Sequence, residues 1–308
     1  MAMRRWGGLL CIVLFSSLLH AECLPPPIAP SASELQKLQA AAKDQGFLWK
    51  ISKDGHDSWL YGTIHVNALA GFFPGPKVKQ ALQRSSILAL ELDLSDAKTQ
   101  VELAQWARMG AGQVPAHLQS RLDAQLAQVC LPASMAQTMH PALLLMSIGV
   151  LGLRPLGLEA EYGSEPMLLG LAQAGQQKIL GLETAAIQMQ ALLGTDSAVS
   201  AEDYELALQQ LESQEDQAIA LKLVKLWADS DLTTLAQYEQ WCCNHAPKQE
   251  ADMLRLLDER NPGLANGITQ LHREGASIFA AVGSLHMVGK NSLLFLLAKQ
   301  GFKIERIH

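Results

Sequence analysis

The sequence predicts an α/β (α+β) protein with a central mixed sheet, flanking helices and a large helical insertion. Short apolar runs of strand length recur near both ends of the chain, and long stretches with the 3.6-residue periodicity of amphipathic helices separate them. One strand–helix–strand succession favours parallel pairing. No low-complexity segment or clear interior linker interrupts residues 47–308, so we expect a single compact unit there.

Length and charge limit the functions that this chain can have. With 308 residues, of which 49% are hydrophobic and 18% charged, the chain is long enough to bury a substantial core. Its net charge of -6 is spread along the sequence, and no Lys/Arg-rich run follows Arg4-Arg5. A protein that binds the phosphate backbone needs a basic surface, so the composition argues against nucleic acid as a partner.

The first 21 residues have the pattern of a cleaved signal peptide. Arg4 and Arg5 precede an apolar stretch from Gly8 to Leu19, and Ala21 is the small residue expected at a cleavage site. An uncleaved anchor helix is the alternative, but the apolar stretch is shorter than the roughly 20 residues that span a bilayer. We therefore expect a periplasmic or secreted protein without a stable membrane span after cleavage, in which residues 22–46 form a proline-rich leader and a helix.

Four cysteines remain after such cleavage: Cys23, Cys130, Cys242 and Cys243. An exported protein can form disulfides, and adjacent cysteines rarely pair with each other because the geometry is strained. Pairing of Cys130 with Cys242 and pairing with Cys243 both remain open. The sequence has no Cys-x-x-Cys pair, which argues against a thiolate metal site.

Apolar runs and breaker residues predict the order of the elements. Helical periodicity fills two inserted regions, about 99–175 and 184–274. Within the second, Asn261 followed by Pro262 is expected to cap and start a helix. The expected strands, of which the first two form a hairpin, are 47–52, 59–65, 86–94, 178–182, 278–286 and 302–307.

Two of these strands end in the same short pattern, Gly62-Thr-Ile-His65 and Gly283-Ser-Leu-His286. Glycine has no Cβ, so another backbone, a metal ion or a substrate can approach the strand closely at Gly62 and Gly283. The histidine that follows then lies at the strand end. This repetition suggests that His65 and His286 belong to one site.

Glu91 and Glu183 also lie at or near the ends of expected strands. In open α/β sheets, ligands bind beyond the carboxyl ends of the strands. Two imidazoles with one or two carboxylates suit Zn, Mn, Co or Fe(II), and an open coordination position would activate water or polarise a carbonyl. The alternative is that each residue is a hydrogen-bonded structural residue or is solvated. Arg260 and Asn261 are candidates for binding a substrate carboxylate or peptide.

Other catalytic patterns do not occur. The sequence contains no Gly-x-Ser-x-Gly elbow, His-Glu-x-x-His helix, Gly-x-x-x-x-Gly-Lys loop or Gly-x-Gly-x-x-Gly fingerprint. Their absence argues against a serine hydrolase, a zincin, an NTPase and a dinucleotide-binding protein.

An ordered set of short motifs between residues 47 and 307 resembles the TraB/GumN (PrgY-like) family, which is related to the Tiki metalloproteases. Each motif is weak alone, whereas their shared order is specific. The motifs are Leu48-Trp-Lys-Ile51, Tyr61-Gly-Thr-Ile-His65, Leu90-Glu-Leu-Asp93, Gly181-Leu-Glu-Thr184 with Gln188, Trp227 to Leu235, Arg260-Asn261 and Ala281 to Gly289. Two positions depart from the family pattern: Glu159 stands in place of an aspartate, and Ser230 in place of the glycine that often precedes Asp231.

The resemblance implies a metal-dependent hydrolase, most closely a peptidase that uses Mn or Co. By this match His65, His286 and Glu91 form the metal centre, and Glu183 is a fourth member as ligand or general base. The implied substrate is a peptide or protein. Two alternatives stay open, a non-catalytic peptide-binding or regulatory protein and an ester hydrolase using the same centre, and the oligomeric state is also open.

Overall fold

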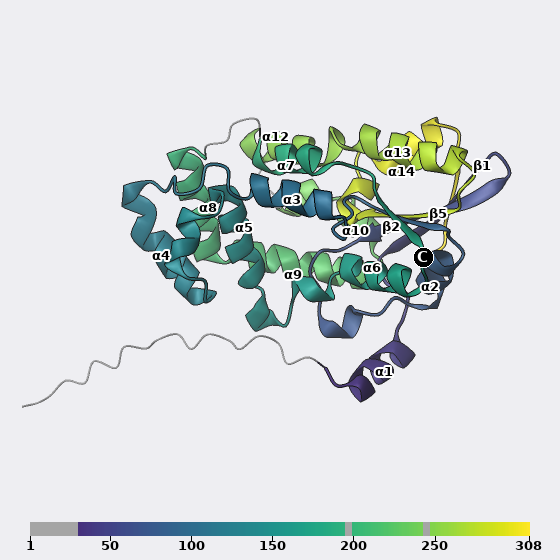
Figure 1. The fold of residues 1–308 in the computed structure, drawn as a ribbon, viewed down its shortest axis with the longest axis horizontal. Helices are drawn as coiled ribbons and strands as arrows, with labels where there is room; N and C mark the ends of the chain where they lie inside the picture. Colours follow the sequence, from purple (N-terminus) through teal and green to yellow (C-terminus); the bar gives the residue numbers. More distant parts are fainter. Residues whose placement is uncertain (1–29, 195–198, 243–246) are drawn as a thin grey trace, which may run out of the picture.

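The computed structural model describes residues 30–194, 199–242 and 247–308 (Figure 1). The expected signal peptide, residues 1–21, lies outside these ranges, as do Cys23 and Cys243. Within them, no helix has both the length and the apolar character needed to cross a bilayer. Cys130 and Cys242 are both disulfide-bonded.

A six-stranded mixed sheet with flanking helices confirms the expected fold class. The strand order is β4-β3-β5-β2-β1-β6. Strands β1 (Phe47–Lys53) and β2 (His56–Thr63) form the expected antiparallel hairpin. Its two-residue turn, Asp54-Gly55, has positive φ at both positions, 51° and 82°, as a type I′ turn requires.

Parallel pairing joins the strands that carry the site. Strand β5 (Ile278–Gly283) pairs in parallel with both β2 and β3 (Ile87–Leu90), and β3 pairs in parallel with β4 (Lys178–Gly181). The last strand, β6 (Lys303–Arg306), pairs antiparallel with β1. The carboxyl ends of β2, β3, β4 and β5 therefore lie at the same edge of the sheet.

These strands end earlier than the sequence predicted. Strand β2 stops at Thr63 and β5 at Gly283, and neither runs on to its histidine. After Gly283 the chain turns at once into a 3-10 helix, Ser284–Met287, which carries His286. The apolar side chains at Ile64 and Leu285 extended the predicted strands because hydrophobicity does not distinguish a strand from the turn that follows it.

Helices cover both faces of the sheet (Figure 1). Helices α13 (Asn261–Arg273) and α14 (Leu293–Lys299) lie on one side. On the other side lie α2 (Pro76–Gln83), α6 (Ser164–Ala174) and α9 (Glu215–Ala228). The main hydrophobic core forms between these layers and includes Phe279, which is fully buried.

The helical region at the far end from the hairpin has its own hydrophobic cluster. It is built on α4 (Gln119–Gln128), α5 (Pro141–Leu151) and α8 (Ala201–Ser213), which bury Leu122, Ile148 and Tyr204 against one another. Helix α5 is strongly apolar, although Met146 and Val150 on it are 46% and 39% exposed. The remaining α-helices are α1 (Ala32–Ala41), α3 (Ala97–Trp106), α7 (Ala185–Leu193), α10 (Leu232–Leu235), α11 (Tyr238–Cys242) and α12 (Pro247–Met253).

The two departures from the family pattern have local explanations. Ser230 has a φ of 56°, in the left-handed region that favours glycine, and its hydroxyl lies 2.8 Å from His308 Nε2. Glu159 accepts a hydrogen bond from Arg154 Nε at 3.0 Å, and its backbone pairs with Asn67. Each substitution is thus accommodated by contacts of its own.

Candidate functional site

Four sequence-predicted residues follow the ends of four neighbouring strands. Glu91 comes directly after β3, His65 and Glu183 come two residues after β2 and β4, and His286 lies in the 3-10 turn after β5. Because these strands are parallel, the four side chains meet at one edge of the sheet.

Gly283 marks the point where three of them come together. A Cβ built on Gly283 would lie 3.3 Å from Glu91 Oε1, 3.6 Å from His286 Cδ2 and 3.8 Å from His65 Nε2. The Gly283 amide donates a hydrogen bond to Glu91 Oε1 at 2.8 Å. Both imidazoles therefore have an atom within 4 Å of this point. Gly62, by contrast, faces Ser284 and the ring of Phe47.

His65 is oriented by a carboxylate from α6. Its Nδ1 lies 3.0 Å from Glu165 Oε1, which also accepts a hydrogen bond from Thr63 Oγ1 at 2.6 Å. The Glu165 carboxylate raises the pKa of His65 to about 9. The His65 side chain is 75% exposed, so it reaches solvent as well as the shared point.

The backbone next to His65 is held in place by the start of α6. Ser164 Oγ accepts a hydrogen bond from the Ile64 amide at 2.7 Å, and the Ser164 amide donates to Ile64 O at 2.9 Å. Gly163 allows this approach, because a Cβ there would lie 2.5 Å from His65 O. The histidine is therefore positioned by a segment about a hundred residues away in sequence.

His286 is buried and oriented by Asn261. Its Nδ1 lies 2.6 Å from Asn261 Oδ1, while Asn261 Nδ2 donates to Asn291 O at 2.9 Å. Burial lowers the pKa of His286 to about 4, so the imidazole is neutral near pH 7. A neutral imidazole that donates from Nδ1 has a lone pair on Nε2, available to a cation or a proton.

The expected role of Asn261 as a helix cap is wrong. Arg260 is the N-cap residue of α13, and Asn261 is already the first helical residue. The chain enters α13 from a π-helix, Leu254–Asp258, with almost no break, so the helix start lies one residue earlier than Pro262 suggested. Instead of capping the helix, the side-chain oxygen of Asn261 accepts the hydrogen bond from His286 Nδ1.

Arg260 connects the two glutamates. Its Nη2 donates to Glu91 Oε2 at 2.5 Å and to Glu183 Oε2 at 2.6 Å, and its Nε donates to both Glu183 oxygens at 3.1 Å. Its Nη1 lies 3.4 Å from His286 Nε2. All three ionic side chains are nearly buried, at 8% exposure for Arg260, 11% for Glu91 and 3% for Glu183.

Burial and charge shift these carboxyl groups in opposite directions. Burial works against ionisation of Glu91, but the nearby His286, His65 and Arg260 outweigh it and hold the pKa of Glu91 at about 2. For Glu183 burial dominates and raises the pKa, although Arg260 opposes the shift. Gln188 Nε2 also donates to Glu91 Oε2 at 3.2 Å, which adds to the support of the ionised form.

The donor set fits a divalent metal ion, although the side chains do not stand in coordinating positions. Across residues 30–194, 199–242 and 247–308, no group of three or more His, Cys, Asp or Glu side chains has metal-binding geometry. In both histidines, Nδ1 nevertheless lies within hydrogen-bonding distance of an oxygen, as in almost all metal-ligating histidines. His65, His286 and Glu91 could therefore hold an ion if Arg260 turned toward Glu183 alone.

Sequence reasoning missed Glu165. It lies in the first turn of α6, and nothing in the local pattern connects it with His65. Arg260 was expected as a substrate contact, whereas the structure shows it bridging Glu91 and Glu183.

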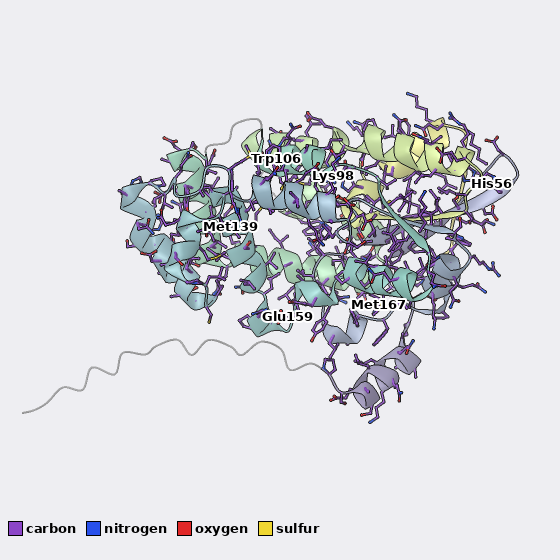
Figure 2. The ribbon with its side chains drawn as sticks, viewed as in Figure 1. His56, Lys98, Trp106, Met139, Glu159 and Met167 are labelled. Atoms are coloured by element: carbon purple, nitrogen blue, oxygen red, sulfur yellow. The ribbon has the colours of Figure 1, made fainter. Side chains whose placement is uncertain are left out.

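A second buried histidine lies at the opposite edge of the sheet. His272 is 1% exposed; its Nδ1 lies 2.8 Å from Ser58 Oγ and its Nε2 3.0 Å from Lys53 O. The ring stacks on that of His56 at 3.7 Å between centroids. His56 lies at the hairpin tip (Figure 2). Burial lowers the pKa of His272, and the hydrogen bond to the Lys53 carbonyl opposes this shift; the nearby His56 lowers the pKa further, whereas Asp54 raises it. These contacts give His272 a structural role.

Together, the fold and the site define a mixed α/β protein whose strand-end centre is built from two Gly-x-x-His turns and a buried glutamate–arginine–glutamate cluster. The model of the TraB/PrgY/gumN family matches residues 47–306, and the chain belongs to this family.

Comparison with individual proteins adds one partial match. The chain is 40% identical over 90 residues to Metalloprotease TIKI1 of Danio rerio. The aligned stretch covers 27% of this chain and 18% of that relative, so the chain spans less than a fifth of the relative's length. No solved structure matches the chain.

Proposed function

We propose that this chain is an exported metal-dependent hydrolase, most closely a metallopeptidase. The observation that carries the proposal is the meeting of His65 Nε2, His286 and Glu91 Oε1 at Gly283, with each imidazole oriented through Nδ1. The partial likeness to a metalloprotease supports the same class. The donor set suits Mn, Co or Zn.

The position of each residue suggests its role in the proposed reaction. His65, His286 and Glu91 would hold the ion, which when bound lowers the pKa of water and polarises a carbonyl. Glu91 presents Oε1 to the shared point, which favours it as a ligand. Glu183 faces Arg260, which suits it to hold that side chain; Glu91 and Glu183 are the two candidates for general base.

A non-catalytic peptide-binding or regulatory protein is the second candidate. The position of Arg260 between Glu91 and Glu183 favours it, because the guanidinium already supplies the positive charge that these carboxylates need. In that case the histidines would be structural.

Elemental analysis of untagged protein tests the proposal. After incubation with Mn, Co or Zn and removal of free metal, we expect about one ion per chain. The His65→Ala/His286→Ala variant should lose the ion, while His117→Ala, an exposed histidine on another segment, should keep it. A wild-type chain that retains none of the three ions refutes the proposal.

Substrate assays separate the kinds of hydrolase. Cleavage of a peptide library by the metal-loaded wild type, lost in the double variant, supports the peptidase. If aryl esters are hydrolysed and the peptides are not, the centre is an ester hydrolase. Binding of peptides without cleavage of either substrate identifies the regulatory alternative.

Export rests on the first 21 residues alone. The mass of the protein recovered from the periplasm or medium should correspond to cleavage after Ala21. Recovery of the full-length chain from the cytoplasm contradicts the predicted location.

A further inference from the structure

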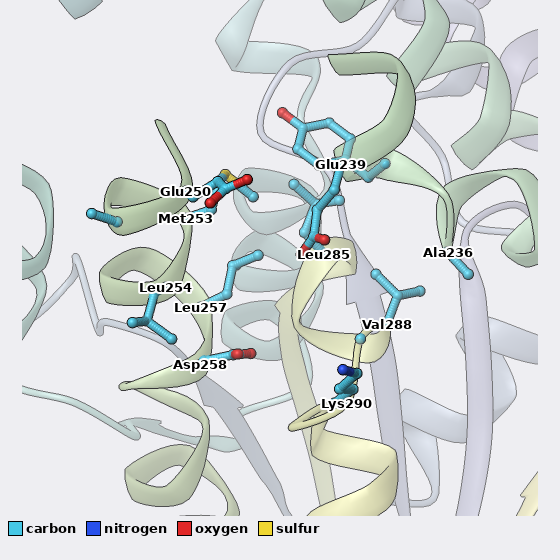
Figure 3. A pocket seen from close by; sticks show the side chains of 13 residues that line it. Ala236, Glu239, Glu250, Met253, Leu254, Leu257, Asp258, Leu285, Val288 and Lys290 are labelled. Carbon is cyan, nitrogen blue, oxygen red and sulfur yellow. The ribbon is translucent and has the colours of Figure 1, made fainter. Parts of the chain in front are cut away.

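A pocket of about 630 Å³ lies between the π-helix Leu254–Asp258 and the turn that carries His286 (Figure 3). Leu257 reaches from the helix toward this turn, whose Leu285 and Val288 form the other wall. The volume falls in the range typical of ligand sites, which is roughly 300–1,000 Å³. The pocket is therefore large enough for a side chain and its neighbours.

The lining of the pocket combines an apolar wall with an acidic rim. Met253, Leu257, Leu285 and Val288 supply the apolar side chains. Glu239 and Asp258 supply carboxylates to the rim, and Lys290 is the cationic side chain among the lining residues that the structure describes. Such a lining complements an aliphatic side chain that is flanked by positive charges.

The pocket adjoins the candidate centre through the same two segments. Leu285 directly precedes His286, and Asp258 precedes Arg260 by two residues. Leu256, next to Leu257, accepts a hydrogen bond from Arg260 Nη1 at 3.1 Å. A side chain bound in the pocket would therefore contact the turn that carries His286.

We infer that this pocket selects peptide substrates by accepting an aliphatic residue, leucine-like in size, next to Lys or Arg. The inference rests on the proposed function in taking the ligand to be a peptide. It adds the sequence preference of the peptide, which the family and the metal donors do not define.

Fluorescence anisotropy of labelled decapeptides on the full chain in EDTA tests the inference without hydrolysis. Three peptides share one sequence except for a central Lys-Leu-Lys, Lys-Ser-Lys or Glu-Leu-Glu. We expect the first to bind about tenfold more tightly than the second, because the leucine side chain is buried, and the third to bind weakest. Equal binding of all three overturns the inference.

Matched variants locate the binding. Leu257→Asn should weaken Lys-Leu-Lys binding about tenfold, and Glu239→Lys about threefold at low salt. The controls Leu221→Asn and Glu215→Lys, which change exposed residues of α9, should leave it unchanged. Thermal unfolding identifies any variant that has lost its fold, and Glu239, being exposed, is expected to tolerate its substitution.

The two proposals fail separately. Pocket-dependent binding of a peptide that the metal-loaded protein never cuts supports the pocket and counts against the hydrolase. Peptide cleavage with the same sequence preference in wild type, Leu257→Asn and Glu239→Lys supports the hydrolase and overturns the pocket.

Discussion

Replacing Asn261 by alanine tests the link between α13 and the centre. Asn261 is fully buried, and its Oδ1 is the acceptor 2.6 Å from His286 Nδ1. Its other contact, to Asn291 O, involves a residue at the surface, where water can replace the lost donor. The main cost is therefore a buried imidazole N–H without a partner.

We expect Asn261→Ala to lower the free energy of unfolding by about 2 kcal/mol, since an unsatisfied buried donor costs roughly 1–3 kcal/mol. Urea unfolding followed by circular dichroism measures this change. Asn266→Ala, which removes an exposed amide from the same helix, should change it by less than about 0.5 kcal/mol.

The imidazole itself gives the sharper measurement. In ¹⁵N spectra of histidine-labelled protein, wild type should show His286 protonated at Nδ1, and Asn261→Ala should shift that signal or mix the tautomers. Asn261→Asp keeps an oxygen acceptor and should keep the Nδ1–H form. If the protein binds metal, Asn261→Ala should weaken binding by about 10- to 100-fold. An unchanged His286 signal in the alanine variant refutes the orienting role.

Two further predictions concern steric contact and pH. Gly163→Ala should destabilise the fold by about 2 kcal/mol, because its Cβ would lie 2.5 Å from the backbone oxygen of His65. Gly283→Ala brings its Cβ only against side chains at 3.3 Å or more, so it should cost less in the same urea titration. Equal costs for the two variants would contradict this reasoning. Burial lowers the pKa of His272, so the unfolded chain binds more protons at this residue below its ordinary pKa of 6.5; the contribution of His272 to stability should be fully present above pH 6.5 and decline as the pH falls. His272→Gln should flatten this dependence while His117→Gln preserves it, and an identical slope in both variants would count against the assignment.

The sequence was sufficient to find the strand-end residues. Apolar runs predicted the strands, and the first polar residues beyond them, such as Glu91 and His65, lie at the shared edge. This works because the first polar residue after a continuous apolar run marks the end of an inner strand. The roles of these residues are still proposals.

The sequence could not predict which side chains far apart in the chain contact each other. The contact of His65 with Glu165 spans a hundred residues, and either residue alone has an ordinary local explanation. The role of Asn261 could not be predicted for a related reason. A helix N-cap and an amide that orients a histidine have the same local sequence, and only the position of His286 distinguishes them.

The place of β5 in the sheet has a consequence for folding. Gly283 and Glu91 are 192 residues apart, yet β5 separates β2 from β3 and pairs with both. During synthesis the hairpin and the β3–β4 pair each keep an open edge until β5 emerges, and such edges invite association with other chains. The slow, non-local step that closes the sheet also brings His286 to Glu91, so a complete centre forms only in a chain that has finished folding.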